Sequence, residues 1–342
     1  MRRGALLISL ALLTSGMCAC GGQAGTRRAS TAAVAGTDTA APPVRWSSLI
    51  HASMPVDLAG PRRDGSLVLA AAGKLSILAP SGRIRPFAPA YRQPGGEPYI
   101  ALFEPTGSHA LCFGPGTVYA LELSGDRGVV AVGTDGRPHQ LVHLSAAGLL
   151  NGIAFDRTGG FGYRLLVTIN HQLTTTVLAI DCHGRVATIT SNAPRVEGGI
   201  AVAPRGFGRF GGDLIAPDEI GGNIYAITPR GRALLVARSG LAHGQDIGVE
   251  SEAFVPTGNR FEMLVSDRRT PGNRHPGDNL ILQIGAAALR GAGVRPGDML
   301  AVSEGAALTD VIHCGPIRCT AHYVAQGPSA AHIEGHVAVL PR

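Results

Sequence analysis

The sequence repeats one short turn four times: Ser81-Gly82-Arg83, Asp135-Gly136-Arg137, His183-Gly184-Arg185 and Arg230-Gly231-Arg232. The four glycines are 54, 48 and 47 residues apart, and an apolar, strand-like run precedes each turn. Short strands joined by glycine turns at a period of about 50 residues are typical of a β-propeller. The spacing therefore predicts an all-β propeller.

A second internal repeat supports this fold. Residues 151–156 and 198–203 are matching apolar strands, and each is followed by a loop with a Phe-Gly step and then by another apolar strand. Each unit thus offers four strands, with the outermost after the Gly-Arg turn, which is one propeller blade. We expect six blades, although the long segment 268–328 leaves seven open.

Closure of the ring calls for pairing between the two ends of the domain, because an open array would leave unpaired strand edges. Residues 337–340 resemble an inner strand. We expect this strand to pair beside residues 67–71, in a blade that continues through residues 75–78 and 84–87.

The amino terminus has the features of an export signal. Arg2 and Arg3 precede an apolar run at residues 5–13, which is too short to span a bilayer, and small and polar residues follow it up to Ala19. Residues 17–22 resemble a bacterial lipobox in which Cys20 accepts lipid. We expect a signal peptide at residues 1–19, and the alternative is a plain secreted protein.

The segment that follows predicts a tether. It is rich in Gly, Ala, Thr and Ser and shows no strand or helix period, so it cannot bury enough apolar surface to fold. We expect a lipid anchor and flexible tether at residues 20–44 and the propeller at residues 45–342. The protein would then be exported and held on the extracytoplasmic side of the cell membrane.

Four cysteines lie within the expected propeller. Cys314 and Cys319 enclose only four residues, and in an oxidising compartment they are expected to form a disulfide. Zinc is the weaker interpretation, because no Cys-x-x-Cys pair occurs. Cys112 and Cys182 could pair with each other, but nothing in the sequence places them together.

Composition excludes one large class of partners. The chain has 342 residues, 48 glycines, 16% charged residues and a formal net charge of +6. Its basic residues are scattered, whereas a nucleic-acid-binding protein concentrates them on a stripe with aromatic stacking residues. We therefore expect no nucleic-acid partner.

Residues 151–156 and 211–218 resemble the six-bladed propellers of the NHL-repeat and gluconolactonase-like superfamily. The resemblance extends over residues 50–342 in periodicity and over residues 148–267 in recognisable sequence. It implies the fold, but the superfamily contains lactonases, esterases, lyases and binding proteins. A likeness at this level does not choose among those activities.

In a propeller, residues at the start of the inner strands converge on the central channel. Those positions offer one amide and four carboxylates, with His109 and His336 nearby; the five are Asn151, Glu197, Glu250, Glu252 and Glu334. Oxygen ligands of this kind suit calcium or another divalent cation. The alternative is that the glutamates are solvated rim residues and Asn151 caps a turn.

The resemblance bears on the same residues. In gluconolactonase-like enzymes an asparagine in an Asn-Gly step is a metal ligand, and Asn151-Gly152 is similar to that step. The chain departs from the family where Glu197-Gly198 stands in place of Asp-Gly, and a counterpart of the family's first-blade glutamate is not evident.

Other catalytic patterns are absent from the sequence. It contains no Gly-x-Ser-x-Gly elbow, no His-Glu-x-x-His pair and no phosphate loop. Asp218 and Glu219 could form an acid/base pair, but Gly221-Gly222 just beyond them favours a hairpin turn. Two functions remain: a propeller that binds a protein, glycan or small ligand, and a metal-dependent hydrolase of lactones or related esters.

Overall fold

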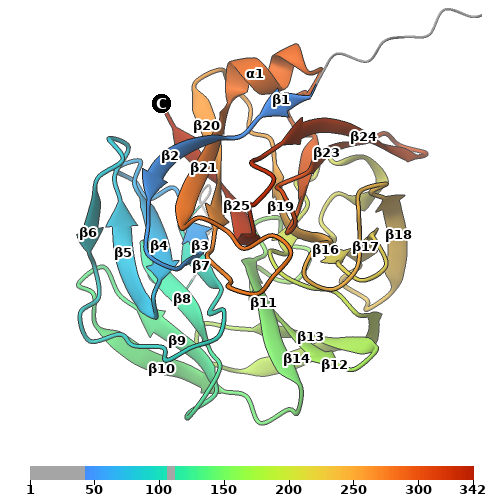
Figure 1. Cartoon of the computed structure of the whole chain (residues 1–342). Coiled ribbons are helices and arrows are strands. Elements are labelled where there is room, and N and C mark those ends of the chain that lie inside the picture. Colours follow the sequence, from blue (N-terminus) through green and yellow to red (C-terminus); the bar gives the residue numbers. More distant parts are fainter. Residues whose placement is uncertain (1–42, 106–111) are drawn as a thin grey trace, which may run out of the picture. The chain divides into compact units, whose positions relative to one another are not determined.

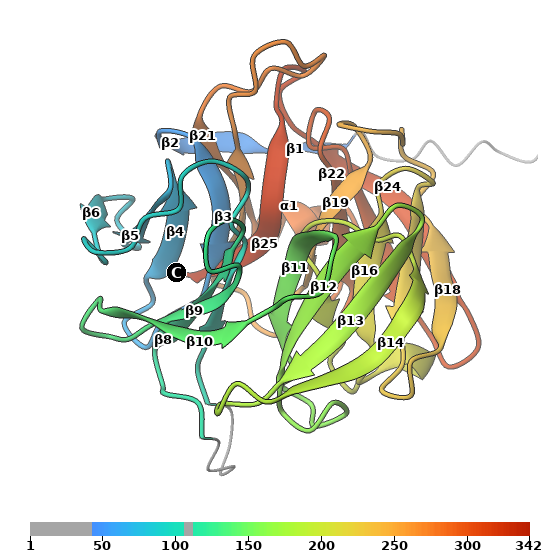
Figure 2. The ribbon, with the colours of Figure 1, turned by 90° about the horizontal axis from the view of Figure 1, so that it is seen from below.

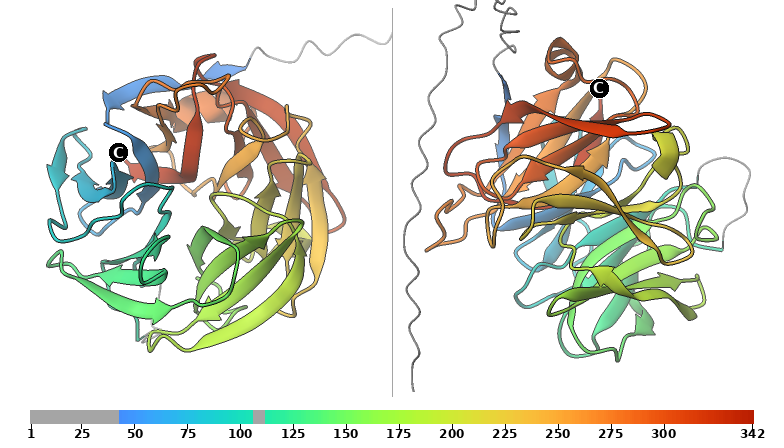
Figure 3. Two further views of the ribbon diagram at one scale, coloured as in Figure 1. Left: turned by 60° about the horizontal axis from the view of Figure 1, so that its bottom comes forward. Right: turned by 90° about the vertical axis from the view of Figure 1, so that its right-hand side faces the viewer.

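The computed structural model describes residues 43–105 and 112–342, and these residues form six sheets arranged in a ring around a channel (Figure 1 and Figure 3, left). The six-bladed propeller is therefore confirmed. The predicted signal peptide, Cys20 and nearly all of the tether lie outside the described residues. No helix among the described residues is long and apolar enough to cross a membrane.

The first four blades follow one another along the chain, and in each the strands pair in sequence order. Blade 1 contains β3 (Pro55–Ala59), β4 (Leu67–Ala71), β5 (Lys74–Leu78) and β6 (Ile84–Pro86). Blade 2 contains β7 (Ile100–Phe103), β8 (Thr117–Glu122), β9 (Gly128–Val132) and β10 (Pro138–His143). Blade 3 contains β11 (Leu149–Phe155), β12 (Leu165–His171), β13 (Thr174–Ile180) and β14 (Val186–Pro194). Blade 4 contains β15 (Ala201–Val202), β16 (Leu214–Asp218), β17 (Asn223–Ile227) and β18 (Ala233–Arg238), with a short 3-10 helix, Gly208–Phe210, before β16.

The Gly-Arg turns lead into the outer strands of these four blades, as the sequence predicts. Gly184 has φ of +75°, and a Cβ atom placed on it would lie 2.4 Å from the carbonyl oxygen of Leu141 in the preceding blade. Gly136 and Gly231 make the same approach to the blade before them. Glycine is required there for two reasons, because it permits the positive φ and allows one blade to touch the next.

The last two blades exchange strands. Blade 5 pairs β19 (Val249–Phe254), β22 (Met299–Ser303), β23 (Thr309–Cys314) and β24 (Cys319–Gln326). Blade 6 pairs β25 (Ile333–Pro341), β20 (Phe261–Asp267), β21 (Leu280–Gly285) and β2 (Ser47–His51). After the inner strand of blade 5 the chain thus builds two strands of blade 6. It then passes through the short helix α1 (Ala286–Gly291) and returns to complete blade 5.

Ring closure uses a different pair of strands from the predicted one. Val339 of β25 pairs with Met263 of β20, so residues 337–340 do not pair beside β4, and that prediction is wrong. The inner position of blade 1 belongs to β3, and β2 closes blade 6 by pairing with β21. The sequence Ser-Ser-Leu-Ile-His of β2 is short and largely exposed, so it gives little apolar signal as a strand.

A further N-terminal strand ties the two exchanged blades together. β1 (Val44–Arg45) pairs in parallel with β24 and forms a fifth strand of blade 5, as the blue and dark red ribbons in Figure 1 show. Trp46, between β1 and β2, is buried in the core shared by blades 5 and 6, and its indole N–H donates to Thr309 Oγ1 over 2.8 Å. The first described residues therefore bridge two blades.

Two disulfides hold the outer parts of the ring. Cys314–Cys319 joins the adjacent strands β23 and β24, and Cys112–Cys182 joins a loop of blade 2 to the turn after β13 in blade 3. The core consists of apolar layers between neighbouring blades. Buried residues of neighbouring blades pack against one another in these layers, and Figure 2 shows the same blades from below.

Candidate functional site

The inner strands of the six blades run in the same direction around the channel, so one end of the channel collects the residues at which these strands begin. We call this end the channel mouth. Among the described residues it gathers seven acidic side chains, namely Glu97, Glu197, Glu219, Asp246, Glu250, Glu304 and Glu334. Glu97 and Asp246 are exposed, Glu197 is half-buried and the other four are buried, so the mouth is an acidic surface with a buried floor.

Two glutamates from adjacent blades share one tyrosine. The Tyr99 hydroxyl donates to Glu250 Oε1, and it lies 3.4 Å from Glu334 Oε2. Glu250 is 4% exposed and Glu334 is 2% exposed. Burial raises the pKa of Glu250 well above its usual range, and the nearby charge of Glu334 raises it further. Both effects favour the protonated form of Glu250.

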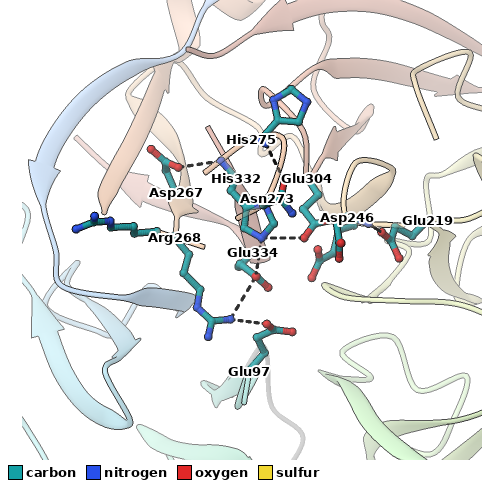
Figure 4. Close-up of polar contacts among 12 residues, drawn as sticks. Glu97, Glu219, Asp246, Asp267, Arg268, Asn273, His275, Glu304, His332 and Glu334 are labelled. Carbon is teal, nitrogen blue, oxygen red and sulfur yellow. Dashed lines mark hydrogen bonds and ion pairs between the residues drawn. The ribbon is translucent and has the colours of Figure 1, made fainter. Parts of the chain in front are cut away.

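His332 bridges two buried glutamates. Its Nε2 atom lies 3.0 Å from Glu304 Oε1 and 3.3 Å from Glu334 Oε1, and Figure 4 shows the three side chains pointing toward one another. Burial alone would lower the pKa of His332, but hydrogen bonds to both glutamates outweigh it and raise the pKa to about 10. The imidazole is therefore a cation at neutral pH.

Arg268 supplies a second cation. Its Nη1 atom lies 3.3 Å from Glu334 Oε1 and also donates to Glu97 (Figure 4). Arg268 follows β20, and Glu334 lies near the start of β25, so this ion pair depends on the pairing of these two strands in blade 6. The guanidinium links the exposed edge of the mouth to its buried floor.

Glu219 and Glu304 form a carboxyl–carboxyl contact on the other side of the mouth. Glu219 follows β16, and it accepts the backbone N–H of Asp246. The pKa of Glu219 is raised to about 8 by burial and, next, by the charge of Glu304, to which it also hydrogen-bonds. The pair therefore holds a shared proton at pH 7.

Two sets of three residues could hold a metal ion. In the first, Glu304, His332 and Glu334 each place one ligand atom within 4.8 Å of the others, and in the second Glu219, Asp246 and Glu304 do the same. Glu304 belongs to both sets. Among the described mouth residues, seven carboxyl groups face three cations, namely Arg195, Arg268 and His332, so protons or a bound cation must balance the remaining charge.

The structure places four of the five sequence-predicted ligands at the mouth, in two pairs. Glu250 and Glu334 form the pair joined by Tyr99, and the side chains of Asn151 and Glu197 are hydrogen-bonded neighbours. Asn151 also donates to the Val196 carbonyl over 3.0 Å and accepts from Thr168 over 3.1 Å, so its amide is already satisfied.

Glu252 and His336 lie elsewhere in the channel. Glu252 belongs to a cavity further along the channel, on a stretch of β19 beyond Glu250. His109 lies outside the described residues. His336 lies on the channel axis, and its backbone N–H and ring Nδ1 both contact the carboxylate of Asp57 at 2.7 and 2.9 Å.

Asp57 and His336 tie the inner strands together. Asp57 in β3 accepts the backbone N–H of Ile100 in β7 over 2.6 Å, and it is fully buried. The carbonyl groups of Ile153 and Ile200 hydrogen-bond with His336 from blades 3 and 4. Burial alone would lower the pKa of His336, but the charge of Asp57 and these bonds raise it. We call this pair the axial ion pair, and it separates the mouth from the cavity.

Sequence reasoning missed Glu219, Asp246, Arg268, Glu304 and His332. Asp218 and Asn223 do pair at the predicted hairpin, but the turn also carries the Glu219 side chain into the mouth. One sequence pattern could have placed His332 at the mouth. His332 and Glu334 are two residues apart, and in an extended chain such side chains point to the same side.

No protein-family model matches the chain, and no curated protein matches it in sequence. A chain of a nidogen/laminin complex is similar in structure, with a TM-score of 0.52 at 11% identity, over 84% of this chain and 86% of that chain. A virginiamycin B lyase from Staphylococcus aureus, solved with quinupristin, has a TM-score of 0.49 at 14% identity, over 84% of this chain and 77% of that chain. A gluconolactonase from Xanthomonas campestris has a TM-score of 0.48 at 12% identity, over 84% of this chain and 79% of that chain. The first likeness shows the propeller fold, and none of the three assigns an activity.

Proposed function

We propose that the protein is a binding propeller whose channel mouth holds a divalent cation, and that this cation forms part of its ligand site. The observation that carries the proposal is the position of Glu304, which belongs to both sets of three candidate ligands. Carboxylate oxygens at this density suit calcium, magnesium or manganese, and the imidazole of His332 adds a ligand that manganese or zinc accepts.

Protonation gives the proposal its pH dependence. Glu219 has a pKa of about 8 and shares a proton with Glu304, so a cation must displace that proton to bind both carboxylates. Cation affinity should therefore fall as the pH is lowered from 8 to 6, and binding should release protons. His332 would remain ion-paired when only Glu219, Asp246 and Glu304 coordinate the ion.

The test is the metal content and metal affinity of the purified propeller. The protein is stripped with a chelator, reloaded with calcium, magnesium, manganese or zinc, and titrated by calorimetry. Glu304→Gln removes the carboxylate common to both sets, and we expect at least a tenfold loss of affinity, or about 1.4 kcal/mol. Glu122→Gln, outside the mouth at the end of β8, is the matched control and should bind as the wild type does. Absence of specific binding by all four ions contradicts the proposal.

A metal-dependent hydrolase of lactones or related esters is the second candidate. It is favoured by one feature, the Glu219–Glu304 pair, because a carboxyl group with a pKa near neutrality can move a proton in general acid/base catalysis. Hydrolysis of a lactone panel by the metal-loaded protein, abolished in Glu219→Gln and unchanged in Glu122→Gln, would support it. A metal-loaded protein without such activity supports the binding propeller.

We also propose that the chain is exported and anchored by lipid at Cys20, because the sequence around that residue resembles a lipobox. Two acyl chains on one cysteine suffice for stable membrane attachment. Cys20→Ser should move the protein from the membrane fraction to the soluble fraction. A wild-type protein without lipid, detected by mass spectrometry of the N-terminal peptide, contradicts this anchoring.

A further inference from the structure

The channel contains a second compartment beyond the axial ion pair. Its cavity of about 310 Å³ is lined by the inner strands of all six blades, at positions toward the strand ends rather than the strand starts. Most of the lining residues have apolar side chains, with Ile100, Leu102, Phe155 and Phe254 among them, and polar groups make up about half of the lining surface. A volume near 300 Å³ is at the small end of the range for ligand pockets.

Glu252 is the buried acidic residue of this compartment. It is 1% exposed, its Oε1 accepts the backbone N–H of Ala201 over 3.2 Å, and its Oε2 has no hydrogen-bond partner among the described residues. Burial raises the pKa of Glu252 well above its usual range. Burial thus disfavours the ionised form of Glu252, which would place a negative charge beside the cavity.

A cationic residue lines the same cavity from another blade. Arg157 follows β11 and is exposed, and its Nη2 donates to the Leu102 carbonyl over 3.2 Å. The nearest acidic residue acting on it is Glu104, which already pairs with Arg63 at 3.5 Å. The guanidinium therefore has donors and charge available for a ligand.

The other charged groups of the compartment do not oppose an anion. His336 lines the cavity, and its imidazole pairs with Asp57. The Asp57 carboxylate also accepts the backbone N–H of Ile100 in an inner strand. The cavity thus presents Arg157, the paired His336 and a glutamate whose negative charge burial disfavours. Its polarity is opposite to that of the channel mouth, where carboxylates predominate.

We propose that this cavity binds a small carboxylate whose apolar chain packs against the inner strands, with its charge paired to Arg157. Glu252 lines the same cavity, and burial disfavours the charge with which it would repel the carboxylate. The site is separate from the cation site at the mouth, because the axial ion pair lies between the two compartments. A four- to eight-carbon monocarboxylate fits the size and the chemistry of the lining.

The experiment is a calorimetric titration of the full propeller with hexanoate at pH 6, with hexylamine and hexanol as comparison ligands. We expect hexanoate to bind and the other two to bind at least tenfold more weakly. Arg157→Gln should weaken hexanoate binding at least tenfold, whereas Arg185→Gln, an exposed arginine of an outer turn, should leave it unchanged.

Two further variants distinguish the cavity from the mouth as the place where hexanoate binds. Glu252→Gln keeps the side chain uncharged, so it should bind hexanoate within about threefold of the wild type at pH 6 and lose the weakening that ionised Glu252 causes at higher pH. Glu304→Gln, at the mouth, should leave hexanoate binding unchanged even if it abolishes metal binding. Binding of hexylamine in preference to hexanoate, full binding by Arg157→Gln, or no binding of hexanoate overturns the proposal.

Discussion

The two compartments of the channel are built from the same six strands, yet they differ in the way charge is stabilised. At the mouth, Glu219, Glu304 and Glu334 lie in contact with one another or with the same histidine, and their charges act on one another. In the cavity Glu252 stands alone, and only burial and one backbone N–H act on its carboxyl group. Glu250 and Glu252 are two residues apart on the same strand, but the axial ion pair lies between the compartments that they line. Neighbouring positions of one strand can therefore have carboxyl groups in unlike environments.

The largest expected effect is a loss of folding stability when the axial ion pair, which separates the two compartments, is broken. Asp57→Ala would leave the His336 imidazole without its carboxylate partner and would leave the N–H groups of Leu58 and Ile100 without their acceptor. Breaking a buried ion pair by removing one partner costs about 3–5 kcal/mol. We expect a loss of that size in urea unfolding.

The control for this variant is Asp64→Ala in the same blade. Asp64 is exposed and contacts only Ser66 through its side chain, so its removal should cost about 1 kcal/mol or less. Equal losses in the two aspartate variants would show that the axial ion pair has no special part in holding the inner strands.

The second expected effect is the pH dependence of folding stability that the residues of the mouth cause. The folded protein keeps a proton on Glu219 up to about pH 8, whereas the unfolded chain releases it near the ordinary value of 4.5. The folded state thus binds more protons between these values, and its stability should fall as the pH rises from 5 to 8, by up to about 4 kcal/mol. His332, with a pKa of about 10, adds stability that is complete below pH 6.5 and is lost as the pH rises through 10.

Glu219→Gln should remove most of the decline between pH 5 and 8, which melting temperatures across that range would measure. The same pH series on Glu122→Gln is the reference. A Glu219→Gln protein whose stability falls with pH as steeply as that of the wild type would mean that the shared proton lies elsewhere.

The smallest expected effect is that of Glu252→Gln at pH 6. An amide oxygen can still accept the Ala201 N–H, and no charged partner is lost because the acid is neutral there. We expect a change in unfolding free energy within about 1 kcal/mol. A loss of several kcal/mol would indicate that Glu252 is ionised and paired, and the contrast between the compartments would fail.

The sequence predicts the blades because the signal is local. In all four Gly-Arg turns the glycine provides the positive φ, and in the last three, at Gly136, Gly184 and Gly231, it also allows the approach to the preceding blade. The exchange of strands between blades 5 and 6 is not local. β20 is as apolar as β22, and nothing in either sequence specifies which one lies beside β19.

The residues of the candidate site were likewise predictable only where the sequence signal is local. Glu250 and Glu334 could be placed at the channel because they begin inner strands, whose positions follow from the repeat. Arg268 and Glu304 reach the mouth from segments that follow exchanged strands, so their positions depend on the pairing that the repeat does not specify. The separation of Glu252 from Glu250 depends on the axial ion pair, a contact between residues 57 and 336.

The exchanged strands also determine the order in which the protein can be completed during synthesis. Blades 1 to 4 each consist of one continuous segment, so each can pair its strands soon after they are made. β2 is among the first strands synthesised, but its partner β21 is made only after four whole blades, and β19 must wait for β22. Both early strands expose unpaired edges during that interval, which favours contact with other chains. The ring is therefore closed only when β21 has paired with β2, and blade 6 is complete only when β25 has paired with β20.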